Sequence, residues 1–302
     1  MAKRRRWKSK LQVRGVIMKK VVKFGGSSLA NAEQFQKVGD IIRSDESRRY
    51  VVPSAPGKRF DEDIKVTDML YGCYDAASKG EDITEKINAI KARYYEIIKG
   101  LGLSLSLEEE FKKIDEDFRA QAGIQYAASR GEFLNGKIMA AYLGYDFVDA
   151  ASVIRFDKAG NLEAEETNKL LSKKLSKSQH AVIPGFYGAC ADGTVKTFSR
   201  GGSDVTGSLV AKAIHADIYE NWTDVSGFLV TDPRIVHNPE PIEAITYREL
   251  RELSYMGATV LHEDAIFPVR KEGIPINIRN TNSPEDKGTR SEERRVGKEC
   301  RS

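Results

Sequence analysis

The sequence has few of the residues on which several protein classes depend. Its 302 residues include only three cysteines, which are widely spaced and form no CxxC pair, so a disulfide-rich secreted fold is not expected. The four histidines are scattered, and no HExxH, GxSxG or GxGxxG pattern is present. No apolar run approaches the ~20 residues that a membrane-spanning helix needs. We therefore expect a cytoplasmic protein that has no membrane partner.

Positive charge is concentrated at the two ends of the chain. The net charge is +4, but residues 1–17 contribute +7 and residues 290–302 contribute +2, which leaves −5 for residues 18–289. This balance does not favour non-specific nucleic-acid binding. We predict that residues 1–17 are a basic extension outside the core; an arm that contacts RNA or DNA is the alternative. Residues 290–302 show no periodicity and are predicted to be a non-native or disordered tail.

Short apolar strands alternate with helices between residues 18 and 289. Strands are predicted at Lys20–Phe24, Val51–Val52, Tyr145–Val148, Ala181–Tyr187, Ile218–Trp222 and Ile274–Ile278. Helices are predicted at Asn31–Arg43, within residues 81–143 with a break at Gly100–Ser106, and at Ser203–Ile214. This alternation is typical of an α/β fold with a mostly parallel sheet that is covered on both faces. Ligands of such sheets bind beyond the carboxyl ends of the strands.

The first strand delivers a lysine and then a glycine pair. In the segment Lys23–Ser27, Gly25 and Gly26 let backbone N–H groups approach phosphate oxygens, and the helix that follows adds positive potential. Lys23 is positioned to neutralise a phosphoryl group during its transfer. An ordinary strand-to-helix turn with an edge lysine is the alternative.

A second glycine turn, Ser199–Asp204, also opens a helix. Arg200 offers a bidentate donor for a carboxylate, and Asp204 lies in the first helical turn, where it can orient a lysine or a metal ion. Two glycine turns, each beside a cation, indicate a ligand with several negative groups. This pairing favours phosphoryl transfer.

A third segment combines Thr223-Asp224 at a strand end with Asp232 and Arg234 in a nearby turn. These side chains can serve the ribose and phosphates of a nucleotide. Capping of turns and helices by Thr and Asp is an equally good explanation of this segment by itself.

Taken together and in this order, the motifs resemble the catalytic domain of the aspartokinases, within the amino acid kinase superfamily. The similarity runs from about Met18 to Thr289. The segments that carry it are VVKFGGSSLA (21–30), GE (131–132), GFYGA (185–189), FSRGGSD (198–204), WTDVSG (222–227), TDPR (231–234) and GATVLHE (257–263).

This resemblance implies a three-layer αβα sandwich that phosphorylates the L-aspartate β-carboxylate with ATP and Mg²⁺, giving 4-phospho-L-aspartate for lysine, threonine and methionine biosynthesis. It implies that residues 18–289 form one catalytic domain, with an N-terminal aspartate-binding part and a C-terminal ATP-binding part. ACT regulatory domains, which normally follow, are absent from this sequence. We therefore expect little feedback inhibition from this chain, and a homo-oligomer only at full length.

The resemblance also implies roles for individual residues. The catalytic pair is Lys23 and Asp204. Substrate-binding residues are Thr67, Glu132, Arg200 and Ser54, with Glu132 on the substrate ammonium and Arg200 on its α-carboxylate. Nucleotide-binding residues are Lys23, Gly25, Gly26, Ser27, Thr223, Asp224, Asp232 and Arg234. No residue is assigned as a dedicated metal ligand.

Two alternatives stay open. The first is another kinase of the superfamily that acts on glutamate, acetylglutamate or UMP, although the pairing of Glu132 with Arg200 favours a free amino acid. The second is a nucleotide-binding fragment that has lost its activity through truncation.

A segment without an assigned role, Gly57–Lys65, is predicted to be an insertion that lengthens the loop before Thr67.

Overall fold

A computed structural model describes residues 18–199, 201–231, 236, 239–255, 261 and 263–291. Within these residues one sheet of eight strands has the order β3-β4-β2-β1-β7-β9-β10-β8. The strands are β1 (Lys20–Phe24), β2 (Arg48–Pro53), β3 (Asp146–Phe147), β4 (Ala181–Val182), β7 (Ile218–Thr223), β8 (Ala244–Ile245), β9 (Ile276–Asn280) and β10 (Thr289–Ser291). All neighbouring strands are parallel except β9 and β10. The mostly parallel α/β sheet predicted from the sequence is thus confirmed.

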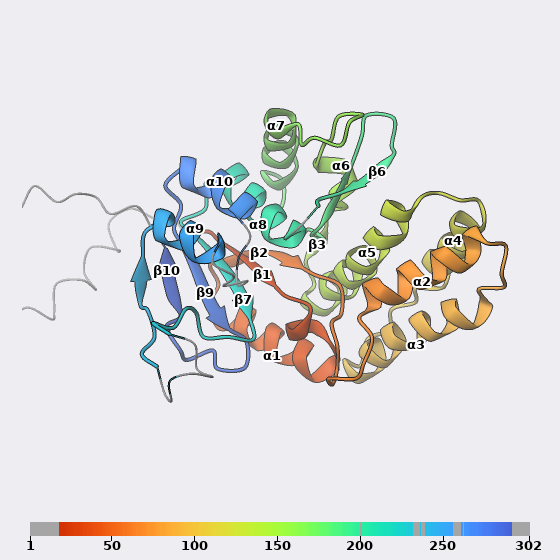
Figure 1. The fold of residues 1–302 in the computed structure, drawn as a ribbon, viewed down its shortest axis with the longest axis horizontal. Helices are drawn as coiled ribbons and strands as arrows, with labels where there is room; N and C mark the ends of the chain where they lie inside the picture. The colour runs from red at the N-terminus through yellow and green to blue at the C-terminus, as the bar shows by residue number, and fades with distance from the viewer. Residues whose placement is uncertain are drawn as a thin grey trace, which may run out of the picture.

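Helices cover both faces of this sheet (Figure 1). One face packs against α6 (Ala150–Val153), α7 (Ala164–Leu175), α8 (Gly202–Ala213), α9 (Tyr247–Tyr255) and α10 (Glu263–Lys271). The other packs against α1 (Ala32–Arg43), α2 (Val66–Ser78), α3 (Thr84–Gly100), α4 (Glu108–Arg119) and α5 (Ile124–Leu143). No helix in the described ranges is both long and apolar enough to cross a membrane.

Strand β1 lies near the centre of the sheet, and its side chains alternate between the two faces. Val21 joins the core beneath α8, whereas Val22 and Phe24 join the core beneath α1 and α5. By the same alternation Lys23 faces α8. The alternation that buries the apolar side chains of β1 therefore also places the Lys23 ammonium group at the carboxyl end of the sheet.

The predicted strand Ala181–Tyr187 is wrong in its second half. Only Ala181–Val182 forms a strand of the main sheet, β4, although Ile183 N and Gly185 N still donate to Val51 O and Pro53 O of β2 at 2.9 and 3.2 Å. Pro184, between these two donors, has no N–H group for a further ladder bond. The segment continues as β5 (Tyr187–Ala189), which pairs with β6 (Val195–Thr197) in a separate hairpin.

The predicted boundary at Thr289 is also wrong by two residues. Strand β10 includes Arg290 and Ser291, and Ser291 is almost completely buried. These two residues pair with both β8 and β9, and such long-range partners leave no periodic signal in a three-residue strand. The rest of the predicted tail, residues 292–302, and the basic extension, residues 1–17, lie outside the described residues.

A buried ion cluster stabilises the central part of the sheet, where β2 and β7 flank β1. The carboxylate of Glu220 on β7 is 2% exposed and accepts hydrogen bonds from Arg48 Nε at 2.8 Å and from Trp222 Nε1 at 2.9 Å. Lys20 Nζ lies 3.1 Å from its other oxygen. Burial by itself raises the pKa of Glu220, but Arg48 and Lys20 outweigh it and hold the pKa below its ordinary value.

Replacing Glu220 by Gln should lower the free energy of unfolding by about 3–5 kcal/mol, because Arg48 stays buried without its carboxylate partner. Urea denaturation at pH 7 measures the difference. Since the folded pKa is depressed, the wild-type advantage is present above the unfolded pKa and should shrink as the pH falls below about 4. The exposed control Glu46→Gln should change stability by less than about 0.5 kcal/mol. Equal stability of Glu220→Gln and the wild type would contradict the role of this cluster.

Candidate active site

The glycine turn after β1 begins the site. Gly25 N donates to Trp222 O on β7 at 3.0 Å, and the short 3-10 helix η1 (Ser27–Leu29) precedes α1. Side chains are excluded at Gly26, where a Cβ would lie 2.9 Å from Ala55 O. The helix predicted at Asn31–Arg43 forms as α1, with Asn31 as its N-cap, and η1 lies between it and the glycines.

Lys23 lies beneath this turn in a buried polar triad. Its Nζ lies 2.6 Å from Asp204 Oδ1 in the first turn of α8 and 3.4 Å from Asn221 Oδ1 on β7. Asn221 Nδ2 also donates to Asp204 Oδ1 at 3.0 Å. A Cβ on Gly25 would lie 3.8 Å from Lys23 Nζ, so the ammonium borders the glycine turn. The predicted residues Lys23 and Asp204 are therefore in direct contact.

Glu132 comes from the opposite side, on α5. Its side chain is 6% exposed, and Oε2 makes no hydrogen bond with the described residues. Burial raises the pKa of Glu132 to about 8, and the nearby Ala55 backbone and Arg130 offset only part of this shift. A buried carboxyl group with an unpaired oxygen is costly for the empty protein. It fits a cationic group that a ligand supplies.

Two further predicted substrate residues lie beside Glu132. A Cβ on Gly131 would lie 3.7 Å from Thr67 Oγ1 on α2 and 2.8 Å from the side chain of Ala55, in the loop that follows β2. A glycine is therefore needed where α5 meets this loop. Asn135, one helical turn after Glu132, donates from Nδ2 to Ser54 O at 2.6 Å. Helix α5 thus fixes the loop that follows β2.

One cavity of about 640 Å³ lies at the carboxyl ends of β1, β2 and β7. Lys23 and Asp204 are not among the described residues that line it; Lys23 borders it from beneath Gly25. Eight of the predicted residues line it: Gly25, Gly26, Ser27, Ser54, Thr67, Glu132, Thr223 and Asp224. Thr223 Oγ1 donates to Asp224 Oδ1 at 3.2 Å at the end of β7. Arg200, Asp232 and Arg234 lie outside the described residues.

Several residues at this site had no predicted role. Asn221 bridges Lys23 and Asp204. The sequence signal that could have indicated it is a polar amide within the predicted strand Ile218–Trp222. Lys58 and Arg59 line the cavity from the predicted insertion. Their position depends on long-range contacts with α3, which no local pattern reveals.

No described group of three or more His, Cys, Asp or Glu side chains is arranged to hold a metal ion. Magnesium in phosphoryl-transfer sites is usually held by one or two carboxylates together with substrate phosphates. Asp204 Oδ2 makes no hydrogen bond with the described residues and fits such a role.

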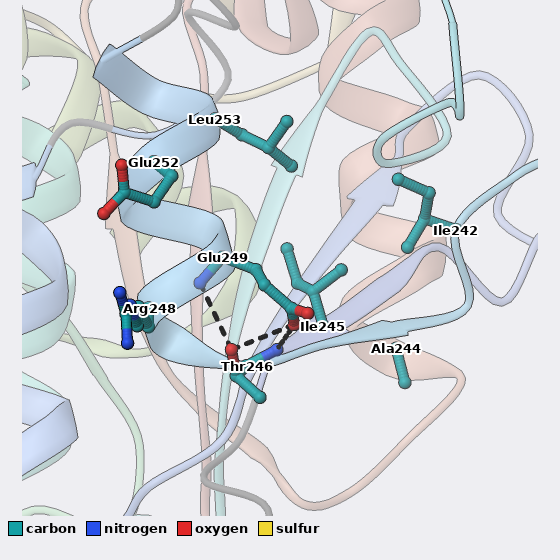
Figure 2. Close-up of a pocket in the computed structure, with 8 residues that line it drawn as sticks. All are labelled: Ile242, Ala244, Ile245, Thr246, Arg248, Glu249, Glu252 and Leu253. Carbon is teal, nitrogen blue, oxygen red and sulfur yellow. Dashed lines mark hydrogen bonds between the residues drawn. The ribbon is translucent and has the colours of Figure 1, made fainter.

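A second hollow, of about 660 Å³, lies between β8 and α9 (Figure 2). Its apolar lining includes Ile242, Ile245 and Leu253. Thr246 and Glu249 form a capping box: Thr246 N donates to Glu249 Oε2 at 2.6 Å, and Glu249 N donates to Thr246 Oγ1 at 3.2 Å. These polar groups stabilise the start of α9, and none of the predicted site residues lines this hollow. We assign no chemistry to it.

Comparison with known proteins agrees with this geometry. The model of the amino acid kinase family matches residues 18–280. Aspartokinase 3 of Bacillus subtilis is 40% identical over 287 residues, which cover 90% of this chain and 63% of that protein. The chain thus spans less than two thirds of this relative.

Solved structures give the same result. Aspartate kinase of Clostridium acetobutylicum superposes with a TM-score of 0.88 at 50% identity, covering 93% of this chain and 63% of that one. Aspartokinase III of Escherichia coli, solved in complex with aspartate and ADP, superposes with a TM-score of 0.79 at 27% identity, covering 91% of this chain and 64% of that one. The predicted resemblance is thereby confirmed, and the chain belongs to the amino acid kinase family.

Proposed function

We propose that this protein transfers the γ-phosphoryl group of ATP to the β-carboxylate of L-aspartate, giving 4-phospho-L-aspartate. The similarity to aspartokinases from Bacillus and Clostridium supports this activity. The E. coli relative that binds aspartate and ADP supports the pair of ligands. The reaction would serve lysine, threonine and methionine biosynthesis in the cytoplasm, a compartment compatible with the free, buried Cys73 and Cys190.

The observation that carries the proposal is the position of Glu132. Its unpaired, buried carboxyl oxygen belongs to a side chain that lines the same cavity as the glycine turn Gly25-Gly26. One part of the cavity suits an ammonium group, and the other suits phosphate oxygens. An amino acid acceptor meets the first requirement, and ATP meets the second.

The chemistry needs no general base. A β-carboxylate with an ordinary pKa near 3.9 is already ionised at pH 7 and is the nucleophile itself. The obstacle is repulsion, because two unit charges 4 Å apart repel by about 4 kcal/mol at an effective dielectric of 20. Cations and oriented N–H groups must offset this energy while the site fixes the reacting atoms.

Different residues around the cavity would neutralise the phosphate charge and hold the nucleotide. We assign the ATP phosphates to the amides of Gly25, Gly26 and Ser27 and to Lys23, which Asp204 and Asn221 orient. Thr223 and Asp224, with Asp232 and Arg234, would hold the nucleotide. Magnesium bound by ATP and by Asp204 would add charge neutralisation at the phosphates.

The acceptor would be held by its zwitterion. Glu132 binds the ammonium, Arg200 binds the α-carboxylate, and Thr67 and Ser54 complete the pocket. A glutamate or acetylglutamate kinase is the nearest alternative; acetylglutamate lacks the free ammonium that Glu132 would bind. Glutamate differs by one methylene, and a panel of acceptors separates it.

Trapping the acyl phosphate with hydroxylamine tests the activity. With Mg-ATP, the chain should form a hydroxamate with aspartate at least tenfold faster than with glutamate, because one extra methylene is worth about 1–3 kcal/mol in a fitted pocket. Lys23→Met should lower kcat by about 10²-fold or more, since it removes a cation that faces the developing charge. Hydroxamate formation that is independent of aspartate, or unchanged in Lys23→Met, would contradict the proposal.

Aspartate binding should release a proton at pH 7. The Glu132 carboxyl group, with a pKa of about 8, is mostly protonated in the empty site, whereas the substrate ammonium favours its ionised form. Aspartate affinity should therefore rise from pH 6 and level off above pH 8. Calorimetric titration in two buffers with different ionisation enthalpies measures the release.

The matched variant for this experiment is Glu132→Gln. It should bind aspartate weakly and without proton release. Because the folded pKa of Glu132 is raised, the empty wild-type protein should lose stability as the pH rises from about 4.5 to 8, and Glu132→Gln should lack this loss. Wild-type binding without proton release at pH 7 would exclude the assigned role of Glu132.

A further inference from the structure

The loop between β2 and α2 forms one wall of the cavity and carries an ammonium group that has no ionic partner among the described residues. Lys58 lines the cavity together with Gly26, Thr67 and Glu132. Its Nζ donates to the backbone oxygen of Asp61 at 2.8 Å and forms no ion pair with any described residue. The Lys58 ammonium is thus available to an anion in the cavity.

The adjacent cation is engaged elsewhere. Arg59 Nε lies 2.8 Å from Asp63 Oδ2, and Arg59 Nη1 lies 2.9 Å from Glu96 Oε2. Donation from Arg59 and Arg93 holds the pKa of Asp63 well below its usual range. Of these two neighbouring cations, Lys58 is the one without a carboxylate partner in the part of the chain that the structure describes.

A buried guanidinium holds this loop in place. Arg93 on α3 is 4% exposed and donates to three points of the loop: Gly57 O at 3.0 Å, Asp63 Oδ2 at 3.0 Å and Ile64 O at 3.1 Å. Both ends of the segment that contains Lys58 are therefore tied to α3. The position of Lys58 beside the cavity is set by the fold.

The loop and α3 are also joined to both parts of the site. Gly57 N donates to Gly26 O at 2.8 Å, which places the residue before Lys58 against the glycine turn. Tyr94, next to Arg93, donates from its hydroxyl to Gly131 O at 2.7 Å, directly before Glu132. Lys58 thus lies on a wall that is joined to the phosphate turn and to the acceptor helix.

We propose that Lys58 is a further substrate-binding residue, whose ammonium pairs with the side-chain carboxylate of the acceptor amino acid. This inference rests on the proposed function. Glu132 and Arg200 would account for the ammonium and α-carboxylate of aspartate, which leaves its reacting carboxylate without a counter-charge on the acceptor side. A lysine suits this position because its flexible point charge can follow an oxygen that moves toward the phosphoryl group.

The test compares Lys58→Gln with Lys58→Arg and with Lys79→Gln; Lys79 is the exposed C-cap residue of α2 and is paired with Asp75. Lys58→Gln should raise the KM for aspartate about tenfold or more while the KM for ATP changes less than about twofold, because one charge-assisted hydrogen bond is lost. Lys58→Arg should restore most of the affinity, and Lys79→Gln should match the wild type. Thermal unfolding of all three variants checks that the fold is intact.

Calorimetric titration with aspartate alone separates this inference from the proposed function. It needs no turnover, and Lys58→Gln should bind aspartate about tenfold more weakly than the wild type. Wild-type affinity in Lys58→Gln, a rise confined to the KM for ATP, or failure of a folded Lys58→Arg to restore binding would each overturn the role of Lys58. Failure of the proposed function would instead show in the wild type, as an absence of aspartate-dependent hydroxamate.

Discussion

The buried contact between Lys23 and Asp204 is the interaction on which the site depends. It joins the central strand β1 to the first turn of α8, and Asn221 on β7 bridges the two side chains. The ammonium is oriented before any ligand arrives, so little reorganisation is needed when phosphate charge approaches. Glu132 differs from Lys23 in this respect. Burial raises the pKa of its carboxyl group, which is therefore mostly protonated in the empty site and would ionise when a cationic group binds. In the proposed reaction, which joins two anions, Lys23 would serve the phosphates and Glu132 the acceptor.

Much of the fold could be predicted from local patterns. The β-branched run of β1, the amphipathic α1 with Asn31 as its N-cap, and the glycine before α8 each contain their own signal. The errors arose where distant contacts decide. Pro184 ended β4 early, and β10 exists because β8 and β9 pair with it.

The site was predictable to a similar degree. Glycine turns at strand ends indicated Lys23 and Asp204, and the structure brings these two side chains together. Nothing local indicated that Arg93, some 30 residues beyond Asp63, holds the loop that carries Lys58. Such a contact depends on the packing of α3, which periodicity alone does not orient. The buried unpaired oxygen of Glu132 likewise becomes visible only when the surrounding residues are in place.

The proposed reaction requires that the acceptor carboxylate lie beside the nucleotide phosphates within one cavity. Nuclear relaxation measures this directly, with aspartate labelled with ¹³C at both carboxylates and a non-hydrolysable ATP analogue that carries Mn²⁺ bound to the wild-type chain. If the β-carboxylate is the acceptor, the metal should relax the β-carboxylate carbon more strongly than the α-carboxylate carbon. Equal relaxation of the two carbons, or stronger relaxation of the α-carboxylate, would contradict it.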